Sequence, residues 1–292
     1  MNRACNEITG FSELLQRFER NISILGRSKR TFENYSRHVA AMALHFGALP
    51  TELHPEQVKD YLFELQQRSN SPSQSYFKHT VYGLRFLLKK NLPYDHLHLP
   101  SIPKEKKLPV ILSREEIWKM LQHADLLKHR ILIGLIYGCG LRCMEARNIE
   151  LKHLDFDRKL LHIVQSKGKK DRYVPLSDHI IRGVKRYISA EHPTIFLFTG
   201  NTKDAKGLDS RYSQRGVQWA IQSVCKKAGI LKDVHTHTLR HSYATHLLED
   251  GVNILQVQKL MGHERVETTM EYLHVCQLEN QKVHSPLDTV FA

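Results

Sequence analysis

A cluster of prolines near the middle of the chain constrains its fold more strongly than any other feature of the sequence. Residues 93–109 contain four of them: Pro93, Pro100, Pro103 and Pro109. Proline lacks a backbone N–H and forces the preceding residue toward extended conformations, so no continuous helix can pass through this segment. We therefore expect two domains, residues 1–92 and 110–280, joined by a semi-stiff linker and followed by a tail, residues 281–292.

The first domain has helical periodicity throughout. Apolar residues recur three and four positions apart over residues 11–18, 35–46, 58–65 and 81–88, as they do along the buried face of a helix. Ser28 precedes the second of these segments and is a suitable N-cap. Because no strand-like alternation interrupts the pattern, the sequence predicts a compact domain of four helices.

The second domain combines helices with a small sheet. Ser113 and Glu116 have the spacing of a capping box, which begins a helix. Further helices are expected over residues 129–138, 214–228, 238–249 and 253–261. Residues 159–165 and 172–176 have the character of two strands joined by a polar turn, and residues 195–198 predict a short third strand. The predicted fold class is mainly α (α+β), with a small antiparallel sheet.

The chain carries a large excess of positive charge. Its 43 Lys and Arg residues outnumber its 30 Asp and Glu residues, which gives a net charge of +13. Such an excess indicates a polyanionic partner, most commonly nucleic acid. No apolar run approaches the roughly 18 residues that span a bilayer, and we expect neither a secretory signal nor a membrane segment. The five cysteines suit a reducing cytosol.

Two segments carry cationic side chains suited to phosphate. Arg142 follows Gly140 where a loop meets a helix, and its guanidinium can form paired hydrogen bonds with a phosphate. Glu145 shares its helical face and can orient an arginine or lysine, although an ordinary helical ion pair explains it equally well. The turn at residues 166–172 is either a basic hairpin tip that could enter a DNA groove or an ordinary solvated turn. Its basic residues are Lys167, Lys169, Lys170 and Arg172.

Two later segments add titratable groups. His237 and Arg240 are three apart at the start of a helix, where they form an anion site containing a group that titrates near neutrality. Four histidines lie in this region: His235, His237, His241 and His246. They raise a zinc site as an alternative, but no His-Glu-x-x-His pattern or cysteine pair supports a metal. Tyr272 stands nine residues after His263 and is either a functional group or a core tyrosine.

In order and spacing, these residues resemble the motifs of the tyrosine recombinase (phage integrase) family, particularly its Xer and integron integrase branch. The matching residues are Arg142, Lys167, His237, Arg240, His263 and Tyr272. Cys139 and Met261 stand where threonine and leucine are usual, and neither change removes a functional group. The chain lacks the long insertion with which integron integrases hold extrahelical bases, which favours a simpler duplex target.

The chemistry expected of such a site begins with its nucleophile. A tyrosine hydroxyl has a pKa near 10, so only about one part in a thousand is ionised at pH 7. A neighbouring group must accept its proton as Tyr272 attacks a DNA phosphodiester, and we expect His237 to be that base or relay. Arg142 and Arg240 would hold the two non-bridging oxygens, and His263 would donate a hydrogen bond to the phosphate.

The resemblance implies the remaining roles. Lys167 would protonate the departing 5′-oxygen, and His241 would support the site indirectly. Because arginines neutralise the phosphate and a 3′-phosphotyrosine conserves the bond energy, no metal, ATP or other cofactor is expected. The expected DNA-binding residues are Lys29, Arg30, Lys169, Lys170 and Arg172, positioning phosphates rather than reading bases.

The same resemblance implies an assembly and a function. Residues 1–92 would form a core-binding (SAM-like) domain and residues 110–280 the catalytic domain. Four protomers would assemble on two DNA sites, the tail at 281–292 docking on a neighbour, although a frayed terminus is the alternative. The expected function is site-specific recombination of duplex DNA, including integration and excision, in the bacterial cytoplasm at the nucleoid.

Two other functions are considered. A type IB topoisomerase shares the chemistry but relaxes DNA without choosing a site, and a DNA-binding regulator could keep the fold without catalysis. The small size and compact helical first half favour the recombinase over the topoisomerase. The presence of all six expected catalytic side chains disfavours the regulator.

Overall fold

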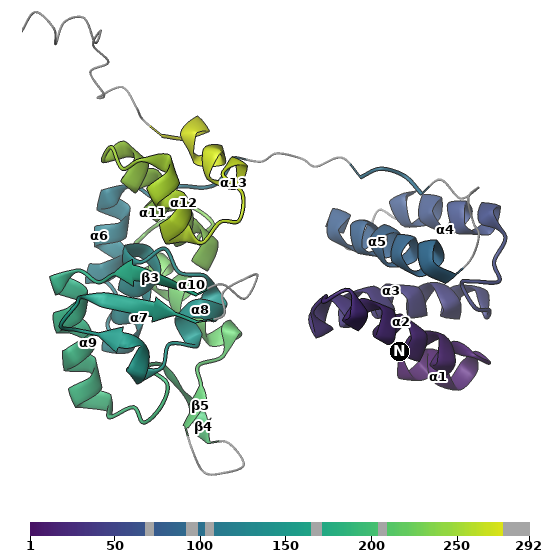
Figure 1. Ribbon diagram of the computed structural model, residues 1–292, viewed down its shortest axis with the longest axis horizontal. Coiled ribbons are helices and arrows are strands. Elements are labelled where there is room, and N and C mark those ends of the chain that lie inside the picture. The colour runs from purple at the N-terminus through teal and green to yellow at the C-terminus, as the bar shows by residue number, and fades with distance from the viewer. Residues whose placement is uncertain (68–72, 92–98, 103–107, 165–170, 204–208, 277–292) are drawn as a thin grey trace, which may run out of the picture. The chain divides into compact units, whose positions relative to one another are not determined.

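The computed structural model describes residues 1–67, 73–91, 99–102, 108–164, 171–203 and 209–276. The chain divides into two compact units, Met1–Glu105 and Lys106–Ala292, which are drawn in Figure 1. Each has its own apolar core. No helix among the described residues combines the length and apolar character needed to cross a bilayer.

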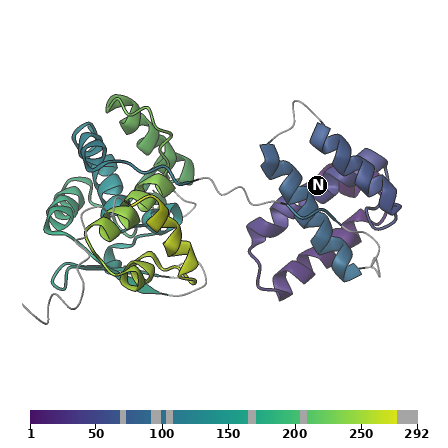
Figure 2. The ribbon, with the colours of Figure 1, turned by 90° about the horizontal axis from the view of Figure 1, so that it is seen from above.

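The described part of the first unit is helical. Its helices are α1 (Asn2–Glu7), α2 (Phe11–Ile24), α3 (Lys29–Phe46), α4 (Pro55–Gln67) and α5 (Ser73–Asn91). The Ser28 hydroxyl caps α3 by accepting from the backbone N–H of Thr31. Helix α3 contacts α1, α2 and α5, and in Figure 1 it lies between α2 and α5 as the middle layer of the unit. Figure 2 shows the same unit from above. The four predicted helices are α2–α5; α1 adds a fifth, too short to show a periodic signal.

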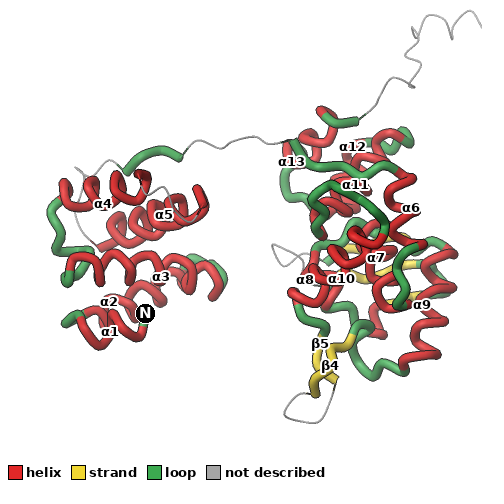
Figure 3. Tube along the Cα trace, turned by 180° about the vertical axis from the view of Figure 1, so that it is seen from behind, coloured by secondary structure: helices red, strands yellow, loops and turns green. Residues whose placement is uncertain are grey.

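In the second unit, several helices pack around one central helix. Its α-helices are α6 (Arg114–Gln122), α7 (Leu127–Gly138), α8 (Cys143–Arg147), α9 (Asp178–Glu191), α10 (Gln214–Lys227), α11 (Thr236–Glu249), α12 (Ile254–Met261) and α13 (Glu267–Met270). Two 3-10 helices are η1 (Leu151–His153) and η2 (Glu271–His274). Helix α7 contacts α6, α9, α10 and α11 (Figure 3), which explains why its apolar residues form a nearly continuous run.

The strands of the second unit form two small antiparallel sheets. They are β1 (Leu154–Asp155), β2 (Leu160–Ile163), β3 (Arg172–Pro175), β4 (Thr199–Lys203) and β5 (Asp209–Arg211). The three-stranded sheet has the order β1-β2-β3, and β4 pairs with β5. In the β2–β3 pair Leu161 lies opposite Val174, and Ile163 lies opposite Arg172. Ile163 and Arg172 are therefore adjacent at the ends of the segment that contains Lys167.

The predicted third strand at residues 195–198 is wrong. In this described segment Phe196 makes one isolated antiparallel bridge to Glu150, and the third strand of the sheet is β1 instead. Leu197 and Phe198 are fully buried in the core of the unit. Ile195, by contrast, is 42% exposed, and an apolar run this short cannot be told from a buried strand by its pattern alone.

Candidate active site

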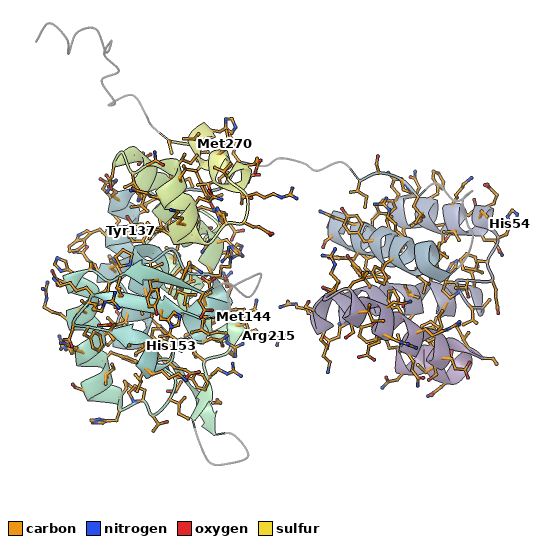
Figure 4. The ribbon with its side chains drawn as sticks, in the orientation of Figure 1. His54, Tyr137, Met144, His153, Arg215 and Met270 are labelled. Carbon is orange, nitrogen blue, oxygen red and sulfur yellow. The ribbon has the colours of Figure 1, made fainter. Side chains whose placement is uncertain are left out.

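Five of the six motif residues lie in the described part of the second unit, on separate elements. His237 and Arg240 belong to α11, and Arg142 occupies the N-cap position of α8. His263 follows the end of α12, and Tyr272 lies in η2. In Figure 4 the labels on Met144 of α8 and Met270 of α13 mark two of the elements around this site. The contacts below connect all five residues.

Five of the predicted residues lie outside the described part of the second unit. Lys167, Lys169 and Lys170 lie outside the described residues. Lys29 and Arg30 are exposed on the first turn of α3, in the first unit.

A single buried carboxylate holds the arginines of the site. The Glu145 side chain is 5% exposed and accepts from Nη1 of Arg142 at 2.7 Å. The backbone N–H of Arg142 also donates to it, at 2.9 Å. Arg172 binds both its oxygens, at 2.7 and 2.9 Å, and Nη1 of Arg240 lies 3.8 Å away. One negative charge thus offsets part of the repulsion among three guanidinium groups.

Arg240 connects α11 to two loops. Its side chain is 3% exposed and donates to the backbone carbonyls of Gly140 and Met261. Gly140 has a φ of 60° and lies against the ring of Tyr243 on α11, where a Cβ would clash. Burial lowers the pKa of Arg240 to about 9, and Arg142 acts in the same direction. The guanidinium stays charged at pH 7.

Arg172 does not have the predicted role of an outward phosphate contact. Its side chain is only 8% exposed, and besides binding Glu145 its Nε donates to the carbonyl of Leu260 at 2.8 Å. As the first residue of β3 it alternates with the buried Val174, whereas Tyr173 between them is exposed. Strand alternation therefore turns Arg172 inward. It ties the end of the hairpin to Glu145 and to α12.

The Tyr272 hydroxyl is hydrogen-bonded with His241 and not with the expected His237. The distance from the hydroxyl oxygen to Nδ1 of His241 is 3.0 Å, and Tyr272 is 4% exposed. His237 stacks its ring on that of His241, with centroids 6.1 Å apart. His263 stacks nearly parallel to the Tyr272 ring, at 6.1 Å and 19°. The contact with the hydroxyl thus belongs to the residue next to Arg240.

The electrostatics of the site keep its histidines neutral. Burial lowers the pKa of His241 to about 4, with His237 and Arg240 acting in the same direction. Burial and Arg240 also lower the pKa of His263, to about 3. Burial lowers the pKa of His237 as well. Burial raises the pKa of Tyr272, while the nearby arginines oppose this shift. At pH 7 the site therefore contains a protonated phenol beside neutral imidazoles.

A glycine at the end of α12 positions His263. Gly262 adopts the left-handed conformation, with a φ of 61°, and ends the helix. Its carbonyl accepts from Nη2 of Arg142 at 3.1 Å, and a Cβ at this position would press on Arg172. His263 then binds the Thr269 hydroxyl through Nδ1, at 2.9 Å. Thr269, which the sequence pattern did not single out, thereby fixes the imidazole ring.

The other histidines of the region have different partners. His235 is bonded to Gln218 and Asp233. Nδ1 of His246 lies 2.9 Å from the hydroxyl of Tyr137, labelled in Figure 4. Within the described residues no three histidine, cysteine or acidic side chains are grouped so as to hold a metal.

Comparison with known proteins identifies the family. The model of the phage integrase family matches residues 111–279, and that of the phage integrase N-terminal SAM-like domain matches residues 14–95. A tyrosine recombinase of Thermosipho africanus is 32% identical over 267 residues, which cover 86% of this chain and 91% of that protein. This chain belongs to the phage integrase family of tyrosine recombinases.

Other relatives and solved structures agree with this membership. The tyrosine recombinase XerA of Pyrococcus horikoshii is 30% identical and is aligned over 90% of both chains. The XerH recombinase bound to a palindromic difH substrate is 20% identical, with a TM-score of 0.70, covering 98% of this chain and 88% of that one. The Tn1549 transposon integrase in complex with transposon right end DNA is 16% identical, with a TM-score of 0.65, covering 95% and 97%. These structures share the fold, and the expected family and fold class are confirmed.

Proposed function

We propose that this tyrosine recombinase is a site-specific DNA recombinase that cuts and rejoins duplex DNA through a 3′-phosphotyrosine at Tyr272. The observation that carries the proposal is the buried Tyr272 hydroxyl, hydrogen-bonded to a neutral histidine beside a cluster of guanidinium groups. Relatives named as recombinases and integrases, and solved structures of such proteins on DNA, support it. Type IB topoisomerase activity and a silent regulator are the alternatives.

The arginines supply the charge that the reaction requires. As the tyrosine oxygen bonds to phosphorus, negative charge develops on the two non-bridging oxygens, and fixed cations stabilise it. The Arg142 side chain is 20% exposed, so part of it is accessible to a ligand. Arg240 lies near Arg142 because both guanidinium groups lie close to the Glu145 carboxylate. We assign both to the phosphate. Since these charges are permanent, the step needs no metal, and since the phosphotyrosine conserves the bond energy, it needs no ATP.

His263 and Lys167 complete the proposed mechanism. When Nδ1 of His263 accepts from the Thr269 hydroxyl, the proton of the neutral ring lies on Nε2, which can donate to a phosphate oxygen. Lys167 protonates the departing 5′-oxygen, as the resemblance implies. Lys167 lies in sequence between β2 and β3, and Arg172 at the start of β3 is bound to Glu145.

The experiment that tests the nucleophile is the variant Tyr272→Phe. We expect it to bind DNA as the wild type does, because one oxygen atom is lost, and to form no covalent protein–DNA complex. The covalent adduct is trapped on a nicked duplex and detected on an SDS gel. The reaction is run in excess EDTA, so that the same assay tests whether cleavage needs a metal ion. Tyr243→Phe, which removes the hydroxyl of a buried tyrosine on α11, is the matched control and should still form the adduct. An adduct from Tyr272→Phe would contradict the assignment.

The larger-scale proposals concern DNA and assembly. We propose that residues 1–92 and residues 110–280 both bind the duplex around the cut site, in line with the net charge of +13. The linker at 93–109 permits them to do so together. Four protomers assemble on two recombination sites, and the tail at 281–292, outside the described residues, docks on a neighbouring protomer. The protein acts at the bacterial nucleoid.

A further inference from the structure

The position of His241 has a mechanistic consequence. His241 follows Arg240 on α11, and its Nδ1 lies 3.0 Å from the Tyr272 hydroxyl oxygen. The tyrosine is 4% exposed, so its hydroxyl is shielded from bulk water. A phenol that is to become a phosphate ester must lose its proton, and a shielded phenol loses it to a protein group within hydrogen-bond distance.

The charge state of His241 suits it as an acceptor. Its surroundings are cationic or neutral: His237 and Arg240 on its own helix, Tyr272 on η2, and His263 after α12. These and burial keep the imidazole unprotonated at neutral pH, so in the tautomer that carries its proton on Nε2, Nδ1 accepts the hydrogen bond of the hydroxyl and can take up its proton. A bound phosphodiester brings negative charge beside Arg240, which raises the basicity of the ring as the reaction begins.

The two other histidines near Tyr272 are placed for different roles. The ring of His237 stacks on that of His241, with centroids 6.1 Å apart, and the hydrogen bond with the Tyr272 hydroxyl is made by His241. His263 lies parallel to the Tyr272 ring, at 19°, and its Nδ1 is engaged with Thr269. His263 therefore presents the face of its ring, and not a nitrogen lone pair, to Tyr272.

We propose that His241 is the general base that accepts the phenolic proton of Tyr272 during DNA cleavage and returns it during religation. In the forward step the O–H bond of Tyr272 breaks, its proton moves to Nδ1 of His241, and the tyrosine oxygen bonds to phosphorus. The bond from phosphorus to the 5′-oxygen breaks, and that oxygen takes a proton from the group assigned as general acid, Lys167. The inference rests on the proposed function of Tyr272 as the nucleophile.

The test replaces His241 with a group that keeps the hydrogen bond but cannot take a proton. In His241→Asn the amide oxygen stands near the former position of Nδ1 and accepts from the hydroxyl. We expect the single-turnover cleavage rate near pH 7 to fall by about 10²-fold or more, the usual contribution of a general base. The remaining rate should rise about tenfold per pH unit toward pH 9, because attack then depends on prior ionisation of the phenol.

Two comparisons separate a base from other roles. On a duplex with a bridging 5′-sulfur, the leaving thiolate needs no proton. Cleavage of this duplex is therefore restored in a variant that lacks the general acid, but not in a variant that lacks the general base. His241→Asn should stay slow on both duplexes. The matched control His237→Asn, one helical turn earlier, should not acquire the steep pH dependence.

Several outcomes overturn the inference. They are a wild-type rate for His241→Asn, a slow rate without the steep pH dependence, or recovery on the 5′-sulfur duplex. If that variant does not fold, His241→Ala with added imidazole replaces it, and no restoration of cleavage by imidazole overturns the inference too. Tyr272→Phe is run in parallel. An adduct from it contradicts the proposed function, whereas an inactive Tyr272→Phe beside a fully active His241→Asn contradicts only the role of His241.

Discussion

At the scale of single residues, the arrangement of the arginines depends on their ion pairs with Glu145. Its buried carboxylate contacts Arg142 and Arg172 directly and lies 3.8 Å from Arg240. Removing one partner of a buried ion pair is strongly destabilising because it leaves buried charge uncompensated. Here the loss would leave three guanidinium groups to repel one another. Glu145 therefore fixes both the stability of this region and the direction in which Arg142 points.

We predict that Glu145→Gln, which keeps the shape and removes the charge, lowers the free energy of unfolding by about 3–5 kcal/mol. Cleavage should also slow strongly, because Arg142 loses its support. Urea denaturation and single-turnover cleavage provide the measurements. Glu150→Gln is the matched control, because Glu150 pairs with a Lys152 side chain that is 73% exposed, and such pairs contribute less than about 1 kcal/mol. Equal losses for the two variants would contradict the role of Glu145.

The sequence named some of the residues that the structure brings together, but it did not indicate the partners of others. Arg142, Arg240 and Tyr272 could be named because motif spacing identifies them without their partners. Arg172 was misjudged because a basic residue at a hairpin end is usually solvated, and its partner Glu145 lies 27 positions away in sequence. The hydrogen bond between His241 and Tyr272 joins residues 31 positions apart. Only the packing of η2 against α11 determines which histidine meets the hydroxyl.

At the scale of elements, the approach of α7 to α11 sets the geometry of the site. The chain turns at Gly140, with a φ of 60°, against the ring of Tyr243 and the sulfur of Met261. The same glycine's carbonyl accepts from Arg240. The turn thus places Arg142, two residues later, beside α11.

We predict that Gly140→Ala destabilises the protein more than backbone strain alone explains. Gly229→Ala is the control, because Gly229 has a φ of 67° but nothing within 4 Å of an added Cβ. Both variants bear the cost of a left-handed conformation, about 1–2 kcal/mol. Gly140→Ala should add roughly 1–3 kcal/mol for overpacking and should slow cleavage, while Gly229→Ala should leave cleavage unchanged. Equal unfolding free energies in urea for both variants would show that the contact with Tyr243 is unimportant.

The elements themselves were largely predictable, and the exceptions have physical causes. Helices α2–α5 follow from apolar residues repeated at helical spacing. Helix α1, at six residues, is shorter than two turns and carries no such repeat. The run at residues 195–198 was mistaken for a strand because full burial of Leu197 and Phe198 produces the same apolar pattern as a buried strand.

At the scale of the whole molecule, the chain consists of two units with separate cores and an overall excess of positive charge. A prolyl linker, predicted at 93–109, connects them. Such a chain can contact DNA with both units. If the second unit alone bound DNA, the first unit would add little to the affinity. Binding by many phosphate contacts has a measurable signature, because each neutralised phosphate releases bound counterions.

We predict that the full chain loses DNA affinity with added salt much more steeply than residues 106–292 alone. The slope of log K against log salt changes by about 0.9 for each phosphate contacted on B-form DNA, so the difference between the two slopes counts the contacts made by the first unit. Titrating one duplex at several salt concentrations gives both slopes. Lys29→Gln combined with Arg30→Gln, at two exposed positions of α3, should reduce the slope of the full chain without altering the cleavage rate at saturating protein. Identical slopes for the full chain and the fragment would mean that the first unit does not bind the duplex, and a reduced slope accompanied by slower saturated cleavage would place Lys29 and Arg30 in the reaction itself.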